Sequence, residues 1–427
     1  HRALDANTSA NNNTAVGFAA LGANTTGTAN TAVGGAAGDA ITTGGYNTAV
    51  GQSSLTALTT GGSNTAVGYA AGQGLTGASN FNVAIGDETM LIAGEKSYNT
   101  AVGSDAMRGI TTGSANVGVG YNSLAALTTG TNNVAMGSGS LDANTTGGSN
   151  TAIGENALTT NTTASNNTAV GKSALQDNTT GGDNTAVGHI SLAACTTGSH
   201  NTAVGRESGT AITTGSENTL IGKAAGFSIT TGGLNVIIGR SAGKLTTTAS
   251  NNTAVGKSAL QNNTTGGDNA AYGYRAMEAL TSGNSNVALG PGALRTMTVG
   301  DRNTAVGYEA LRTANVSSNA DTYNVALGYH AGVAVTTGIK NTILGSFAGE
   351  AISSGSENIM LGYDIENNSA GADRNIVIGN FIAGAGANTV RIGTAAGTAT
   401  LNLDGSDTSW AAASDLRLKK DIADSTV

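Results

Sequence analysis

Apolar and polar positions along the chain recur with a fixed spacing. A short phrase, typically Asn-Thr-Ala-Val-Gly, ends at a glycine that returns from Gly17 to Gly393. Of the 22 intervals between these 23 glycines, 19 are 17 residues long, and the others are 18, 21 and 14. Two stretches of nineteen residues, beginning at Asn166 and Asn251, differ at a single position. Such a register predicts stacked structural repeats and is not typical of a disordered chain.

Three columns of like residues precede the repeat glycine. The residue directly before it is apolar in all 23 repeats, as in Val16, and we expect this column to face a dry interior. The residue two before it is alanine in 16 repeats, and alternation along a strand sends it to the opposite side, where another chain could cover it. Asparagine stands four before it in 22 repeats, where we expect amide stacking and a corner in left-handed backbone.

A second apolar pair, as in Ala20-Leu21, follows the glycine, and Thr-Thr-Gly then predicts another bend. Each repeat is therefore predicted to be one turn of a parallel β-solenoid with two short strands and two corners. The fold class is all-β, with about 23 rungs. Helical repeats do not fit, because Gly, Asn and Thr disfavour helix and 17 residues cannot hold two helices.

The repeat also predicts the domain organisation. Residues 1–12 are a lead-in, residues 13–393 the solenoid shaft, residues 394–413 a connector, and residues 414–427 the start of a different segment.

Composition narrows the possible functions. With 65 glycines, 11% charged and 4% aromatic residues, a globule of 427 residues would lack the large side chains that fill a core. The single cysteine, Cys195, excludes an intrachain disulfide and predicts an apolar filler. A net charge of -8 without a basic run argues against nucleic acid as a partner, and no apolar run approaches the roughly 18 residues of a membrane span. Nothing indicates a cofactor or a metal site.

The position just after the repeat glycine carries candidate binding chemistry. It holds a run of cationic or protonatable residues and then several tyrosines: Lys172, His189, Arg206, Lys223, Arg240, Lys257, Tyr274, Tyr308, Tyr329 and Tyr363. One interpretation is a stripe for an acidic cell-surface polysaccharide, with the tyrosines stacking on sugar rings. The alternative is a solvated face, or an edge paired with carboxylates of a neighbouring chain.

Two further features are candidate sites. Asp183, His200 and Glu217 form a column in which the flanking carboxylates favour imidazolium; a surface ion pair fits better than metal or acid-base chemistry, because a straight column does not converge. The 21-residue repeat carries four extra residues near Asn315 to Asp321, and we expect a bulging loop that is a better recognition site than any rung.

The repeat resembles known fibrous proteins over residues 13–393. Asn-Thr-Ala-Val-Gly, the small-Leu pair and Thr-Thr-Gly are similar to the left-handed parallel β-roll of trimeric autotransporter adhesin heads, and still more to the shaft repeats of phage tail fibres. The resemblance implies a left-handed coil and a homotrimer, whose partner chains would cover the alanine column. It also implies an extracellular location, on a virion or a bacterial surface.

A second resemblance lies after the repeats. Residues 414–419, Ser-Asp-Leu-Arg-Leu-Lys, resemble the junction that opens the intramolecular chaperone of endosialidase-type tail spikes and fibres. The resemblance implies self-cleavage between Ser414 and Asp415, with Ser414 as the nucleophile and Lys419 assisting it. This would be a maturation device. The alternative is an amphipathic stub without chemistry.

The function that these features favour is the structural and adhesive shaft of a trimeric fibre that presents or contributes to receptor binding. Such a protein is not an enzyme, apart from the self-cleavage. A glycan-degrading tailspike is the first alternative; it needs two carboxylates about 5 to 9.5 Å apart, whereas acidic residues such as Glu155, Glu309 and Glu350 are dispersed along the sequence. Ice binding by threonine ladders is a minor alternative, weakened because the threonines are adjacent and only one of each pair can face outward.

Overall fold

A computed structural model of the chain describes residues 2–318, 320–403 and 411–412. It contains two compact units, residues 1–223 and residues 224–427, each described by itself below. All regular elements of the described residues are β-strands, and no helix occurs among them. The two units hold about 22 turns of parallel β-solenoid with a 17-residue repeat, which confirms the predicted fold class at this level.

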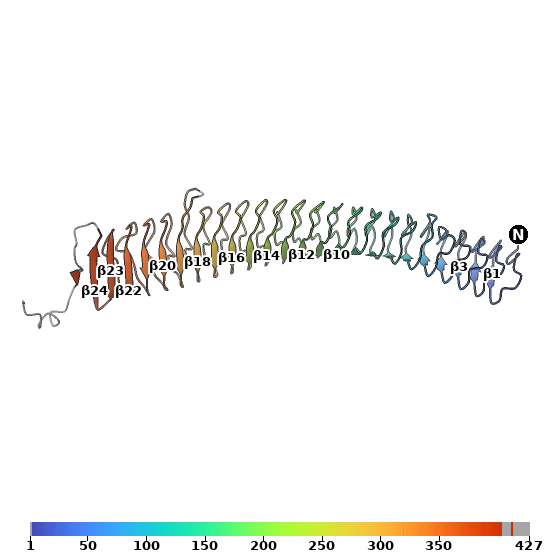
Figure 1. Ribbon diagram of the computed structural model, residues 1–427, viewed down its shortest axis with the longest axis horizontal. Helices are drawn as coiled ribbons and strands as arrows, with labels where there is room; N and C mark the ends of the chain where they lie inside the picture. The colour runs from blue at the N-terminus through green and yellow to red at the C-terminus, as the bar shows by residue number, and fades with distance from the viewer. Residues whose placement is uncertain (1, 319, 404–410, 413–427) are drawn as a thin grey trace, which may run out of the picture. The chain divides into compact units, whose positions relative to one another are not determined.

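Unit 1 is built from thirteen three-residue strands, and within the unit each strand pairs in parallel with the strand one repeat further on. Thr14 lies opposite Thr31 and Val16 opposite Val33, so equivalent positions of the repeat stack on one another (Figure 1). The strands are β1 (Thr14–Val16), β2 (Thr31–Val33), β3 (Thr48–Val50), β4 (Thr65–Val67), β5 (Val83–Ile85), β6 (Thr100–Val102), β7 (Val117–Val119), β8 (Val134–Met136), β9 (Thr151–Ile153), β10 (Thr168–Val170), β11 (Thr185–Val187), β12 (Thr202–Val204) and β13 (Thr219–Ile221).

Unit 2 continues the same pattern and ends differently. Its parallel strands are β14 (Val236–Ile238), β15 (Thr253–Val255), β16 (Ala270–Tyr272), β17 (Val287–Leu289), β18 (Thr304–Val306), β19 (Val325–Leu327), β20 (Thr342–Leu344), β21 (Ile359–Leu361), β22 (Ile376–Asn380) and β23 (Thr389–Thr394). Two antiparallel strands follow, β24 (Gly397–Asn402) and β25 (Ala411–Ala412), so the parallel stacking stops within the predicted connector.

The two faces of the strand are the reverse of those predicted. The alanine column faces the interior, and Ala32, Ala49 and Ala66 are completely buried. The apolar column before the glycine faces outward; Val33 is 38% and Ile221 39% exposed. The prediction was wrong because the opposite wall of the coil already supplies the large side chains of the core, so the strand has room for little more than a Cβ atom.

The opposite wall fills the core through the residue four after the glycine. Leu21, Leu55 and Leu158 stand at this position and are completely buried. In some of the repeats where this position is glycine, the strand carries the large residue instead. A Cβ atom on Gly209 would lie 2.7 Å from Cδ1 of Leu220, which takes the place of the strand alanine. The core volume of a rung is thus shared between two positions that compensate each other.

The predicted asparagine ladder is present and lies inside the coil. Asn47 is 1% exposed, and its Nδ2 atom donates to Oδ1 of Asn30 at 3.1 Å and to the carbonyl of Gly61 at 3.0 Å. The backbone N-H of Asn47 donates to the same Oδ1 atom at 2.9 Å. The left-handed residue of the corner is not the asparagine but the one before it, as in Tyr46 with φ of 63°. The asparagines therefore satisfy the buried backbone rather than adopt the strained conformation.

The segment after the glycine is not a second strand. Ala19 and Leu21 both have left-handed backbone, with φ of 57° and 51°, which turns the chain twice within three residues. The N-H of Leu21 donates to the carbonyl of Ala37 in the next repeat at 3.0 Å, whereas the N-H of Gly22 donates back to Ala19 at 3.0 Å. Each rung thus has one strand and a series of turns, because alternate residues bond within the rung and between rungs.

The repeat glycine fixes the contact between successive rungs. Gly34 has φ of +141°, and a Cβ atom there would lie 2.5 Å from the carbonyl oxygen of Gly51. No side chain fits in that space, so the backbones of adjacent rungs touch directly at this corner.

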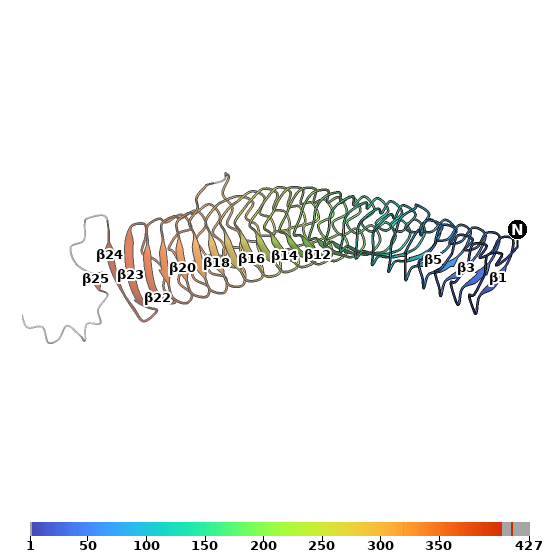
Figure 2. The same cartoon turned by 45° about the vertical axis from the view of Figure 1, so that its right-hand side comes forward.

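Repeats of unusual length keep the strands in register. The 18-residue repeat still sets Val67 opposite Ile85. The 21-residue repeat sets Val306 opposite Leu327, and its additional residues form a loop between β18 and β19 that projects from unit 2 (Figure 2). Extra residues are therefore absorbed in the turns, as expected for loops on a fixed hydrogen-bonded ladder.

Candidate functional site

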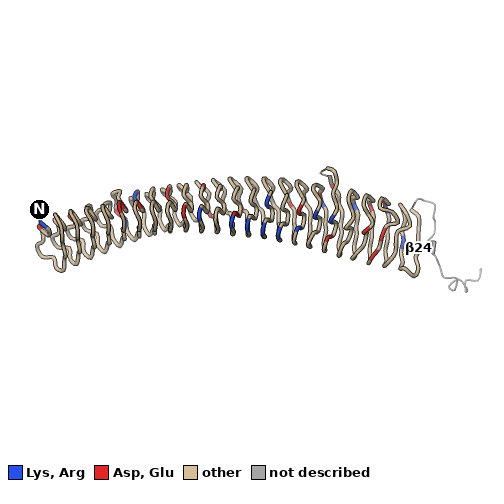
Figure 3. Tube along the Cα trace, turned by 180° about the vertical axis from the view of Figure 1, so that it is seen from behind, with Lys and Arg blue, Asp and Glu red and all other residues tan. Residues whose placement is uncertain are grey.

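The corner glycine places the following residue on the outside of the coil. Because the glycine backbones of successive rungs are in contact, the chain leaves the corner at the same point in every repeat. The predicted cationic column follows this corner, and Lys172, His189, Arg206 and Lys223 of unit 1 are all exposed. Figure 3 shows lysine and arginine recurring along one edge of successive turns. The column therefore lies on the outer surface of this unit.

Carboxylates of the same chain pair with part of the column in unit 1. Nζ of Lys172 lies 3.0 Å from Oε2 of Glu155, which occupies the same position one repeat earlier, and the two side chains are 55% and 54% exposed. Arg206 contacts the adjacent Glu207 at 2.7 Å. Within the described residues no ion pair involves His189 or Lys223. Exposed pairs of this kind contribute about 0 to 1 kcal/mol, so the column is not held together by its charges.

The column changes character within unit 2. Arg240 and Lys257 are exposed, and Nζ of Lys257 lies 5.6 Å from the ring centroid of Tyr274. The guanidinium of Arg275 lies 5.0 Å from the same centroid. Tyr274 is thus flanked by two cations at distances typical of cation-π contacts.

The predicted tyrosines lie within a longer aromatic cluster. Tyr308 and Tyr329 are 45% and 44% exposed, and their rings stack with centroids 5.2 Å apart and planes 11° from parallel. Edge contacts continue from Tyr329 to Phe347 at 5.1 Å and from Phe347 to Tyr363 at 5.8 Å. Sequence reasoning missed Phe347, because it stands two after the repeat glycine, in the column beside the one that was followed.

His330 was also missed, and it joins the aromatic cluster to two carboxylates. Its ring lies 4.2 Å from that of Tyr329, centroid to centroid. Nε2 lies 3.5 Å from a carboxylate oxygen of Glu309, and Nδ1 lies 3.4 Å from one of Glu350. A histidine between two carboxylates was predicted for Asp183, His200 and Glu217, but within the described part of the chain no ion pair joins those exposed residues. The arrangement occurs at His330 instead.

Three carboxylates that are dispersed in the sequence come together near this cluster. Oε2 of Glu366 accepts a hydrogen bond from the N-H of Ala351 at 2.7 Å. Burial raises the pKa of Glu366 above its ordinary value, and the charges of Glu350 and Asp364 raise it further. The sequence did not indicate this grouping, because Glu350 and Glu366 are brought together only by the stacking of two repeats.

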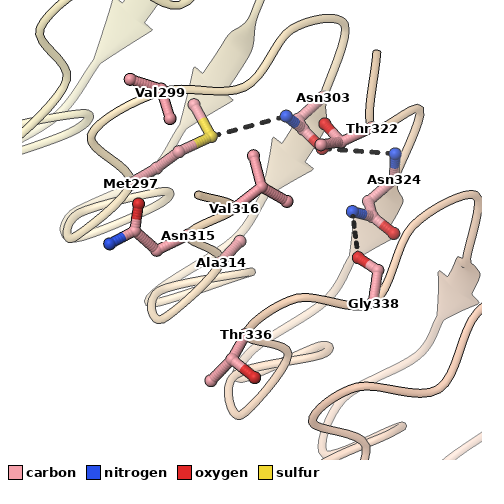
Figure 4. Close-up of a pocket in the computed structure, with 10 residues that line it drawn as sticks. All are labelled: Met297, Val299, Asn303, Ala314, Asn315, Val316, Thr322, Asn324, Thr336 and Gly338. Atoms are coloured by element: carbon pink, nitrogen blue, oxygen red, sulfur yellow. Dashed lines mark hydrogen bonds between the residues drawn. The ribbon is translucent and has the colours of Figure 1, made fainter. Parts of the chain in front are cut away.

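The projecting loop covers a small hollow in unit 2. Figure 4 shows Met297, Val316 and Thr322 lining it. The hollow is too narrow to admit a water molecule. At the base of the loop Arg302 contacts Asp321, whose other carboxylate oxygen accepts a hydrogen bond from the Tyr323 hydroxyl at 2.9 Å. The base of the loop is therefore packed, whereas Ser317 and Ser318 of the loop are exposed.

Two other predictions concern single residues. Cys195 is completely buried, its Sγ atom lies 3.4 Å from the carbonyl of Gly198, and burial raises its pKa to about 11. This confirms the predicted filler. Ser414 and Lys419 lie outside the residues that the structure describes.

Comparison with known proteins assigns no family to this chain. No protein-family model matches the chain, and a search of curated proteins found no significant match. Across residues 2–318, 320–403 and 411–412, no helix has the length and apolar character of a membrane span. In the same residues no group of three His, Cys, Asp or Glu side chains could hold a metal ion.

Proposed function

We propose that the chain is the shaft of a homotrimeric fibre, on a phage or a bacterial surface, that contributes to binding a target cell. The observation that carries this proposal is the exposed apolar column on the outer face of the strands. Its exposed members include Val33, Val67, Ile85, Ile153, Val204 and Ile221 in unit 1, and Leu289, Leu327 and Leu361 in unit 2. A continuous apolar stripe of this kind is typical of a surface that another chain covers.

A copy of the same chain is the partner that fits this column best. Each rung presents one apolar side chain at intervals of about 4.8 Å, and it is branched in every repeat except those of Met136 and Tyr272, so parallel copies have matching periods along their whole length. Cyclic assembly then closes the interface without leaving an unpaired edge. The threefold symmetry and the left-handed coil come from the resemblance to adhesin heads and tail-fibre shafts. The partner chains would cover the valine column rather than the alanine column.

The solution mass tests this proposal. We expect three times the chain mass of 41.6 kDa for the native protein. Replacing Val187 and Val204 by Glu should give the mass of a single chain, because the buried charges would lose their hydration. Replacing Thr180 and Thr197 by Glu is the matched control, since these residues are exposed on another corner of neighbouring repeats. A native protein with the mass of one chain would contradict the proposal.

The adhesive part of the proposal rests on the cationic and aromatic column. It lies one residue beyond the corner glycine and remains exposed in each unit. An acidic polysaccharide of a cell surface is the proposed partner, because lysine and arginine attract its charge and tyrosine faces stack on its rings. The location is accordingly extracellular. Binding of the native protein to target cells at low salt, lost at high salt, would support this part.

Glycan cleavage is a second candidate, favoured by the grouping of Glu350, Asp364 and Glu366. A carboxyl with a raised pKa beside an ionised one is the arrangement that glycosidases use. Incubation with host polysaccharide would release reducing ends, and Glu366→Gln would abolish their release. If the native protein releases none, this candidate is wrong.

Self-cleavage remains a proposal that rests on the resemblance of residues 414–419. Expression of the native gene with Ser414→Ala should leave the chain uncut at this position, and the native chain should be cut. Mass spectrometry of the products distinguishes the two results.

A further inference from the structure

We propose that a slot in unit 2, defined by Tyr274, Pro291 and Tyr308, binds a single anionic sugar ring of the uronic acid type. The inference rests on the proposed polysaccharide binding and names the site and the sugar class. Tyr274 and Tyr308 form the walls, and Pro291 lies on the rung between them. The hollow holds about 100 Å³ of water-accessible space and is open to solvent. This volume is below that of sites for drug-sized molecules, so the slot can hold one ring at the surface and not an oligosaccharide.

The spacing of the walls leaves room for one ring. Tyr308 and Tyr329, on successive rungs, stack at 5.2 Å. Tyr274 and Tyr308 stand on alternate rungs, so they are separated by about 9 to 10 Å. A ring between them would lie about 4.8 Å from each, which is too far for the 3.5 to 4.0 Å carbon contacts of flat rings on both sides. A puckered pyranose, with hydrogens on both faces, fits this distance better.

The rim of the slot favours a carboxylate on that ring. Arg275 and Arg295 share one carboxylate, with Nε atoms 3.2 and 3.1 Å from the oxygens of Glu278. Glu309, which also lines the slot, is paired with Arg312 at 2.9 Å. The rim therefore carries more positive than negative charge. Arginine binds carboxylates with two parallel hydrogen bonds, so an acidic sugar gains an interaction that a neutral sugar lacks.

Calorimetric titration of the full chain tests the inference, with methyl glucuronide as the anionic probe and methyl glucoside as the neutral one. We expect millimolar binding of methyl glucuronide and at least tenfold weaker binding of methyl glucoside. Tyr308→Ala should weaken the binding of methyl glucuronide about tenfold, because one stacking wall is lost. Arg295→Gln should reduce the preference for the anionic probe and leave binding of the neutral probe unchanged.

Two variants separate the loss of the slot from a loss of structure. Tyr308→Phe keeps the ring and should keep the binding. Tyr98→Ala removes an exposed tyrosine that stacks on Phe81, outside both the column and the slot, and should also keep it. If Tyr98→Ala weakens binding as much as Tyr308→Ala, the assignment of the slot is wrong. If both probes bind the native protein equally, the preference for an acidic sugar is wrong.

The same samples show whether the inference or the proposed fibre has failed. A native protein that is trimeric and adheres to cells, yet does not bind methyl glucuronide at tens of millimolar, would overturn the slot alone. A protein that binds methyl glucuronide but has the mass of one chain would support the slot and overturn the fibre.

Discussion

Lys96 is an unusual side chain in the interior of unit 1. It is only 2% exposed and stands where most repeats carry the glycine of Thr-Thr-Gly, as in Gly113. Its Nζ atom donates to the carbonyls of Ile92 and Ile110, each at 2.6 Å. Burial lowers the pKa of Lys96 to about 8. The side chain therefore satisfies two backbone carbonyls. Its ammonium group has lost its hydration shell, and this loss disfavours the charged form.

We expect Lys96 to make unit 1 more stable as the pH rises from 8 to 10.5. In this window the unfolded chain still holds the proton that the folded chain has released, so raising the pH favours folding. The full rise in the free energy of unfolding corresponds to about 3 kcal/mol, because burial lowers the pKa of Lys96 from 10.5 to about 8. Urea denaturation between pH 7.5 and 10.5 should show this rise relative to Lys96→Met, which cannot titrate. Parallel curves for the two proteins would contradict the prediction.

The sequence contains a signal for Lys96, although it was not used. A lysine in a column that otherwise holds glycine or another small residue, such as Ser79 or Ala164, breaks the repeat, and a break inside a stacked array is a place where the side chain has a particular role. Sequence reasoning instead followed the cationic column at the corner, because six such residues at one position are conspicuous. Among the residues that the structure describes, the charged residue that is buried is the one that stands alone in a column of small residues.

At the scale of the element, the stability of one turn of the coil depends on two positions that share its core volume: the strand residue two before the repeat glycine and the residue four after the glycine. Leu220→Ala should destabilise unit 1 by about 2 to 5 kcal/mol, because it leaves a cavity. Gly209→Leu should destabilise it by about 1 to 3 kcal/mol, because the new side chain would collide with Leu220 and Leu192. The double variant should recover most of the loss, since it recreates the pair of Leu192 and Ala203. The midpoint of urea denaturation measures all three.

The backbone permits this exchange. Gly209 has φ of 59° and Leu192 has φ of 50°, so leucine tolerates the conformation that the glycine adopts. If the double variant is as unstable as the sum of the single ones, the two positions do not compensate each other.

The reversed strand faces show what the sequence did and did not determine. The period, the parallel register and the asparagine ladder followed from the spacing alone. The choice of inner face was made from size, which favoured valine over alanine. Alternation offered a better criterion: Asn47 and Ala49 are two residues apart and share a side, and a stacked amide ladder is most stable away from water. A buried ladder therefore already implied a buried alanine column.

At the scale of the whole molecule, stability should depend on register more than on length. Deleting residues 168–184, one complete repeat, joins equivalent positions and should change the urea midpoint only slightly, because each repeat contacts mainly its neighbours. Deleting residues 168–176 instead would bring turn residues onto the strand column and should abolish cooperative unfolding. Far-UV circular dichroism and urea denaturation distinguish the two. Equal damage from both deletions would contradict the stacked arrangement.

The sequence predicted which positions of the repeat form the candidate site, but not the contacts that their side chains make. The corner column and its exposure followed from the repeat, and the structure places Lys172, Arg206, Tyr308 and Tyr329 on the outer surface of their units. Its contacts were not predictable, because they depend on side chains one or two rungs away. The pairing of Lys172 with Glu155 and the packing of His330 against Tyr329 both arise from that stacking.

The side-chain amides of the asparagine ladder give each unit a dipole along its stacking direction. Backbone hydrogen bonds run both ways between rungs, since the N-H of Thr14 donates forward to Asn30 and that of Gly34 donates backward to Val16. The hydrogen bonds between side-chain amides do not alternate: the Nδ2 atoms of Asn47, Asn64 and Asn82 each donate to Oδ1 of the ladder asparagine one repeat earlier. Aligned dipoles add, as they do in an α-helix. The two ends of such a stack are chemically unlike, so a further rung of the same kind can join it in one polarity only.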